Sequence, residues 1–66
     1  MTIVLNGKPT VVANGAKLHD VVALITQQKT GIAVALNGEV LPSSEWVCAT
    51  ICESDVIEVV TAVQGG

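Results

Sequence analysis

The chain is organised around its last predicted strand and the tail that follows it, Val56-Ile57-Glu58-Val59-Val60 and then Thr61-Ala62-Val63-Gln64-Gly65-Gly66. In the strand, Ile57 and Val59 lie on one face of a two-residue alternation, and Glu58 lies on the other. This alternation places the strand inside a sheet. We therefore expect residues 1–60 to form the folded domain and residues 61–66 a flexible C-terminal tail.

The tail carries the chemistry that the rest of the sequence lacks. Gly66 offers a free α-carboxylate, and a glycine pair without Cβ atoms adopts almost any φ/ψ and enters a narrow slot. Six extended residues reach roughly 20 Å, enough to deliver a terminal group into the active site of another protein. We expect Gly66 to be the group that a partner modifies.

Composition limits the remaining possibilities. A chain of 66 residues forms one domain at most, and half of its residues are hydrophobic, almost all of them aliphatic, with Trp46 as the one aromatic side chain. Cys48 and Cys52 stand four positions apart, which fits neither a redox pair nor a metal knuckle. They are interpreted as ordinary small apolar side chains. With a single histidine, His19, interpreted as solvent-exposed, the sequence predicts no metal site and no catalytic pairing of nucleophile and base.

Charge argues against nucleic acid as a partner. Six acidic residues stand against three lysines, a net charge of −3, and no aromatic side chains lie in a basic context to stack on bases. No basic segment precedes an apolar one at the N-terminus, and no apolar run approaches the length that spans a membrane. We expect a cytoplasmic protein, monomeric when free.

The first half of the chain predicts two strands and a helix. Residues 2–5 and 8–12 are strand-like and flank Asn6-Gly7, the dipeptide typical of a type I′ hairpin turn. Pro9 marks the second strand as an edge strand. From about Lys17 the apolar residues follow the spacing of one helical face, with Ile25 as the last, which predicts a helix to about Lys29.

The second half predicts three more strands. Residues 32–36 and 39–41 flank a second Asn-Gly turn, and residues 42–46 form a turn or one turn of helix in which Trp46 covers the open end of the core. The last strand spans residues 56–60. This order predicts an α+β fold in which one main helix packs on one face of a mixed sheet of four to five strands.

Several short motifs stand in a fixed order along the chain: Asn6-Gly7, Ala33-Val34-Ala35-Leu36-Asn37-Gly38, Ser44-Glu45-Trp46, Asp55 and Ala62-Val63-Gln64-Gly65-Gly66. No single motif is specific, but their order and spacing resemble the bacterial sulfur-carrier family of thiamin biosynthesis. This ThiS family is related to MoaD and has the ubiquitin-like β-grasp fold. The resemblance covers essentially the whole chain.

The resemblance implies a sulfur carrier that is a cosubstrate rather than an enzyme. A ThiF/MoeB-like enzyme would adenylate Gly66 with ATP, and a sulfur source would convert it to a thiocarboxylate. A ThiG-like thiazole synthase would then take the sulfur for the thiazole ring of thiamin. Val63, Gln64 and Gly65 would thread into both partners, and the chain itself would bind no cofactor.

Two further expectations concern surfaces and strain. Strand alternation exposes Val4, Ala35 and Val60 together on the sheet face opposite the helix, which is interpreted either as a docking patch or as scattered surface apolar residues. Ser43, Ser54 and Val56 depart from the family pattern. If position 54 needs a left-handed conformation, serine costs on the order of 1 kcal/mol there.

Three other functions remain open at this point. The same activation could supply sulfur to molybdopterin or another sulfur-containing metabolite. Activated Gly66 could instead be joined to a lysine of a target, as in a ubiquitin-like modifier, because the fold alone does not separate carriers from modifiers. Finally, the chain could be an interaction module whose tail is inert.

Overall fold

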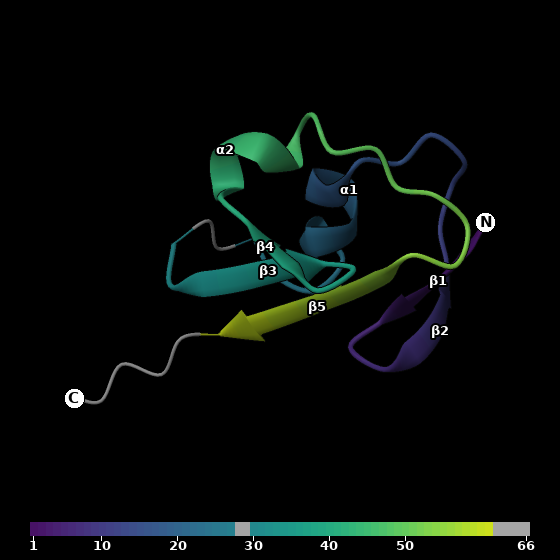
Figure 1. The fold of residues 1–66 in the computed structure, drawn as a ribbon, viewed down its shortest axis with the longest axis horizontal. Helices are drawn as coiled ribbons and strands as arrows, with labels where there is room; N and C mark the ends of the chain where they lie inside the picture. Colours follow the sequence, from purple (N-terminus) through teal and green to yellow (C-terminus); the bar gives the residue numbers. More distant parts are fainter. Residues whose placement is uncertain (28–29, 62–66) are drawn as a thin grey trace.

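A computed structural model describes residues 1–27 and 30–61. Its elements are β1 (Thr2–Leu5), β2 (Lys8–Val11), α1 (Leu18–Ala23), β3 (Ile32–Leu36), β4 (Glu39–Leu41), α2 (Ser43–Trp46) and β5 (Val56–Thr61). The strands form one five-stranded sheet in the order β2-β1-β5-β3-β4, and both helices lie on the same face of it (Figure 1). The predicted α+β fold, a mixed sheet with one main helix in the β-grasp arrangement, is confirmed.

The last strand occupies the centre of the sheet, as its alternation predicts. β5 pairs in parallel with β1 and antiparallel with β3, and each of these neighbours carries its own hairpin partner at the outside. Both hairpins turn on an Asn-Gly pair. Asn6 and Gly7 have φ values of 51° and 81°, and Asn37 and Gly38 have values of 52° and 87°, the positive angles that a type I′ turn requires at both central positions.

The core lies between the sheet and the helices. Its buried residues come from β1, α1, β3, β5 and the segment around α2: Ile3, Leu5, Leu18, Val21, Val22, Val34, Trp46, Ile51 and Ile57. The indole Nε1 of Trp46 donates a hydrogen bond to the carbonyl oxygen of Leu41 at 3.0 Å. The prediction that Trp46 closes the open end of the core, within one turn of helix, is confirmed.

The main helix is shorter than its sequence pattern predicts. α1 ends at Ala23, with Leu24 as its C-cap, and the amides of Leu24 and Ile25 bond to carbonyls three residues back at 3.1 and 2.9 Å. The helix thus ends in a tightened turn, and the Thr26 amide makes a last bond four residues back, to the Val22 carbonyl, at 3.0 Å. Ile25 is 45% exposed, so its predicted place on the buried face is wrong. Lys29 lies outside the described residues.

Smaller differences concern strand ends and single residues. β2 ends one residue earlier than predicted, at Val11, and β5 continues one residue further, to Thr61. Cys48 and Cys52 are exposed free thiols, so neither contributes to the core as a small apolar side chain. His19, predicted to be exposed, is half-buried.

Candidate functional site: the end of the last strand and the open sheet face

The asparagine of the first hairpin turn extends the support of β5 beyond the end of β1. The ladder between the two strands stops at the Leu5 and Ile57 pair. There the Asn6 amide donates to the Ile57 carbonyl at 2.9 Å, and its side-chain Oδ1 accepts from the Val59 amide at 2.8 Å. A side chain thus replaces the next ladder bond and continues the hydrogen bonding of β5 on this side as far as Val59.

The second Asn-Gly turn does the same at the start of β5. The Asn37 amide donates to the Val56 carbonyl at 2.7 Å, and its Oδ1 accepts from the Val56 amide at 2.8 Å. Its side-chain Nδ2 donates to Asp55 Oδ1 at 3.0 Å. The backbone and side chain of Asn37 together fix the position at which β5 begins.

The turn before β5 contains the strained position anticipated from the sequence. Ser54 has φ of 71°, in the left-handed region that L-residues avoid. Its amide donates to the Thr2 carbonyl at 2.8 Å, while the Cys52 amide donates to Asp55 Oδ2 at 2.7 Å. The turn is therefore closed by the aspartate carboxylate and tied to β1, although its left-handed residue is not glycine.

β5 is paired with a neighbouring strand up to its last residue. The last described pair between β3 and β5 joins Ile32 to Thr61, so β5 is held by a neighbour through Thr61, the first residue of the predicted tail. In Figure 1 its arrowhead points away from the β1–β2 hairpin. The residues predicted to carry the function, Val63, Gln64, Gly65 and Gly66, lie outside the described residues.

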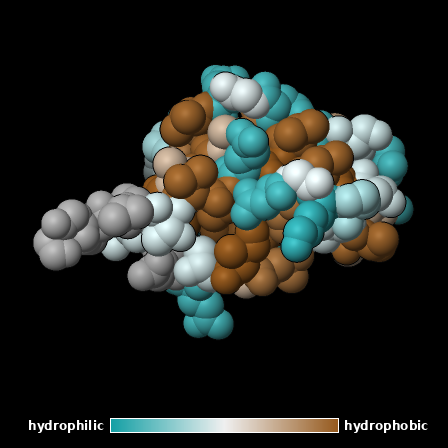
Figure 2. All heavy atoms as spheres, turned by 90° about the horizontal axis from the view of Figure 1, so that it is seen from below, coloured by the Kyte–Doolittle hydropathy of each residue, from teal (hydrophilic) through white to brown (hydrophobic). Residues whose placement is uncertain are grey.

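The sheet face opposite the helices is largely apolar. Strand register places the following residues on this open face: Thr2, Val4, Pro9, Val11, Ala33, Ala35, Val40, Val56, Glu58 and Val60. Figure 2 looks onto this side of the molecule and shows a broad hydrophobic surface crossed by a few hydrophilic side chains. Among the open-face residues, Glu58 is the one that carries a charge. An apolar surface of this extent is typical of a docking site.

The three residues predicted to form a docking patch do share this face, with unequal exposure. Val60 is 61% exposed, whereas Val4 and Ala35 are half-buried between neighbouring strands. More prominent apolar side chains were missed: Val11 is 80% exposed and Val40 is 67% exposed. The alternation of the edge strands contains the signal for both. Val11 stands three residues after Lys8, and Val40 stands one residue after Glu39, so each points to the opposite face from the residue that flanks its Asn-Gly turn.

Acidic side chains serve local structure at three positions, one of which is the start of α1, where Asp20 Oδ2 accepts from the Lys17 amide at 3.0 Å. Asp55 accepts bonds within its turn, as described above, and Glu53 Oε1 accepts from the Thr2 amide at 2.9 Å. Within residues 1–27 and 30–61, no three His, Cys, Asp or Glu side chains gather as metal ligands. In the same part of the chain, no helix has the length and apolar character needed to cross a membrane.

Comparison with known proteins connects this geometry to one family. The sequence profile of the ThiS family matches residues 3–66. Among curated proteins, the sulfur carrier protein ThiS of Escherichia coli K12 is 26% identical over the full length of both chains.

Two solved structures are also similar. The crystal structure of the thiamine biosynthesis protein ThiS from Geobacter metallireducens covers both chains completely, with 32% identity and a TM-score of 0.83. An NMR structure of a thiamine biosynthesis protein from the same organism gives 32% identity and a TM-score of 0.79, covering all of this chain and 88% of the other. From the profile match and the shared architecture, we conclude that the chain belongs to the ThiS family.

Proposed function

We propose that this protein is a sulfur carrier of thiamin biosynthesis and that Gly66 is the residue that carries the sulfur. The main support is the family match, which extends through residue 66 and therefore includes the Gly-Gly tail. The full-length similarity to the sulfur carrier protein of Escherichia coli supports the same assignment.

The chemistry begins at an unreactive group. A carboxylate resists nucleophiles until one of its oxygens becomes part of a good leaving group. In the proposed first step, a Gly66 carboxylate oxygen attacks the α-phosphorus of ATP on a ThiF/MoeB-like enzyme, and pyrophosphate leaves. A sulfur nucleophile then attacks the acyl carbon, AMP leaves, and a thiocarboxylate remains on Gly66. ATP and the sulfur source belong to the partner, and the carrier binds no cofactor.

The carrier acts as a cosubstrate rather than a catalyst in this proposal. Its contribution is to hold β5 by the Asn6 and Asn37 side chains, so that the residues after Thr61 extend from a fixed point. Val63, Gln64 and Gly65 would thread into the adenylating enzyme and then into a ThiG-like thiazole synthase. We place these steps in the cytoplasm.

The open face is the surface we propose for docking on these partners. Val60 belongs to β5, and Val4 and Ala35 lie on the two strands beside it. Because β5 leads into the tail, a partner that covers this face would also receive the terminus. Substituting Val60 with Asp should weaken adenylation by raising KM while leaving the folded domain intact, because Val60 is 61% exposed. Val47→Asp is the matched control, since Val47 is 56% exposed and follows α2 on the opposite side.

Intact mass spectrometry tests the assignment of Gly66. The protein is incubated with ATP, a candidate adenylating enzyme and a sulfide source. The proposal predicts a mass gain equal to one sulfur atom replacing one oxygen atom, absent in a variant that lacks Gly66. Protein-sized adducts on lysine would instead indicate a modifier, and an unchanged mass with active enzyme would indicate an interaction module. Transfer of the loaded sulfur to a molybdopterin precursor, but not to thiazole, would identify the related carrier function.

A further inference from the structure

The free edge of β2 exposes backbone groups that no strand of the described sheet uses. β2 is the outermost strand on its side. The terminal ammonium of Met1 donates to the Val12 carbonyl, and the Val12 amide donates to the Met1 carbonyl, both at 2.8 Å. In an antiparallel ladder such bonded pairs alternate with unbonded ones. The neighbouring Val11 therefore directs both its amide and its carbonyl away from β1, toward the free edge.

The groups on either side of Val11 differ in kind. Pro9, two residues earlier on the same edge, has a carbonyl but no N–H. Ala13, two residues later, has an N–H on this edge, but its carbonyl already accepts from the Ala16 amide at 3.2 Å. The edge thus presents an acceptor at Pro9, a donor and an acceptor at Val11, and a donor at Ala13.

This order is self-complementary under a two-fold axis. If Val11 of one copy faces Val11 of a second copy, the two residues exchange both of their bonds. Pro9, which can only accept, then faces Ala13 of the second copy, which can only donate. A proline on an edge strand normally protects that edge from pairing. Here Pro9 disfavours registers in which its position would have to donate a hydrogen bond, but the register centred on Val11 requires no donor from it.

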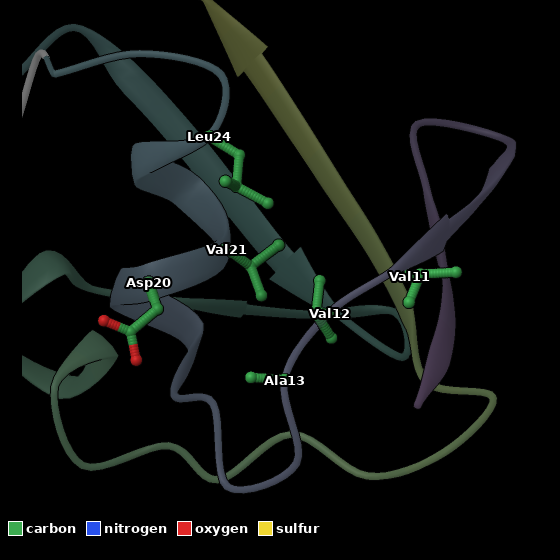
Figure 3. A pocket seen from close by; sticks show the side chains of 6 residues that line it. All are labelled: Val11, Val12, Ala13, Asp20, Val21 and Leu24. Carbon is green, nitrogen blue, oxygen red and sulfur yellow. The ribbon is translucent and has the colours of Figure 1, made fainter.

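A groove beside the edge has room for the side chains of such a second strand. It has a volume of about 300 Å³ and is lined by Val11, Val12, Ala13, Asp20, Val21 and Leu24. Figure 3 shows Val21 and Leu24 of α1 turned toward the chain that leaves β2.

The opposite edge of the sheet lacks these features. On β4, the hydrogen-bonded pair of Leu36 and Glu39 flanks the Asn-Gly turn, and the next pair, Ala35 and Val40, is not hydrogen-bonded. The amide and carbonyl of Val40 therefore point away from β3, toward the free edge. The next outward position is Pro42, which has no N–H, and its carbonyl already accepts from the Glu45 amide at 2.9 Å. The β4 edge therefore offers a single residue for pairing.

We propose that two copies of this chain associate through their β2 edges, centred on Val11, to form a continuous ten-stranded sheet. The association also brings the two Val11 side chains, each 80% exposed, into contact across the axis. It departs from the expectation of a monomer and does not depend on the proposed function. The strand added is a second copy of β2 rather than an unrelated peptide, because the donor and acceptor order of the edge matches itself.

Sedimentation equilibrium over a range of protein concentrations tests this proposal. The full chain is kept in a reducing buffer because Cys48 and Cys52 are exposed thiols. We expect a dimer with a dissociation constant below about 1 mM. Val11→Lys, which opposes two lysines across the axis, and Val11→Pro, which removes the central donor, should each raise that constant at least about tenfold.

The same substitutions at position 40 are the matched controls and should leave the constant unchanged. Circular dichroism checks that each variant folds, and Val11→Lys retains every backbone donor if Val11→Pro does not fold. A wild-type chain that stays monomeric to about 1 mM would overturn the proposal. A dimer lost through the Val40 variants but kept in the Val11 variants would also overturn it. The proposal would also be overturned if the chain were monomeric and an unrelated extended peptide shifted the NMR signal of the Val11 amide.

Discussion

Replacing Ser54 with glycine should stabilise the fold, because the residue holds a conformation that serine disfavours. Its φ is 71°, and an L-residue in the left-handed region costs roughly 1–2 kcal/mol. The contact made by Ser54 in the turn comes from its backbone amide, which donates to Thr2, and glycine retains that amide. The side chain is exposed, so its removal leaves no cavity.

The gain is reduced by the unfolded state. Glycine gives the unfolded chain more conformational freedom, which costs about 0.4–1 kcal/mol on folding. The net stabilisation should therefore be about 0.5–1 kcal/mol. For a domain of this size, that corresponds to a rise in Tm of roughly 3–6 °C.

Urea and thermal unfolding followed by circular dichroism measure this difference. The matched control is Ser44→Gly, since Ser44 is also exposed but lies within α2. Glycine in a helix costs about 0.5 kcal/mol relative to serine, so the control should lower the stability while Ser54→Gly raises it. If both substitutions lowered the stability by similar amounts, the strain attributed to Ser54 would not exist.

Three further predictions concern single residues. Asn37→Gly also relieves a positive φ, but it removes the side-chain bonds to Val56 and Asp55. The free energy of unfolding should therefore fall by about 1–2 kcal/mol, and a more stable variant would contradict the role of these bonds. Trp46→Phe should lower stability by about 2 kcal/mol, because the bond to the Leu41 carbonyl is lost and the core loses volume; an unchanged urea midpoint would argue against the role of the indole. Deleting Gly66 should leave Tm within about 1 °C of the wild type while abolishing adenylation, and a large fall in Tm would refute the separation of tail and domain.

Local patterns were sufficient to predict most of the fold. Two of the three Asn-Gly pairs, at Asn6 and Asn37, identify hairpin turns because few other dipeptides accept two consecutive positive φ values. The third pair, at Asn14, is not a hairpin turn, and only its glycine has a positive φ. The alternation of Ile57 with Glu58 placed β5 inside the sheet. The helix was less accurately predicted, because the apolar spacing continues to Ile25, whereas α1 ends at Ala23 and Ile25 is 45% exposed.

Long-range contacts account for what the sequence could not predict. The Asn6 side chain reaches Val59, 53 residues away, and no local signal indicates that a turn residue also supports another strand. The open face was only partly anticipated for the same reason. Strand alternation assigns Val11 and Val40 to this face, but their exposure of 80% and 67% follows from their places on the two outermost strands, which only the assembled sheet shows.

The central claim is that Gly66 carries the sulfur of the thiazole ring. Its most direct test follows labelled sulfur through a single turnover. Gly66 is loaded with a heavy sulfur isotope by the adenylating enzyme, and the purified carrier is mixed with thiazole synthase and its other substrates. The account predicts that the label appears in the thiazole product and that the carrier returns to the mass of its free carboxylate. Unlabelled thiazole, or equal thiazole formation with a chain that lacks Gly66, would contradict it.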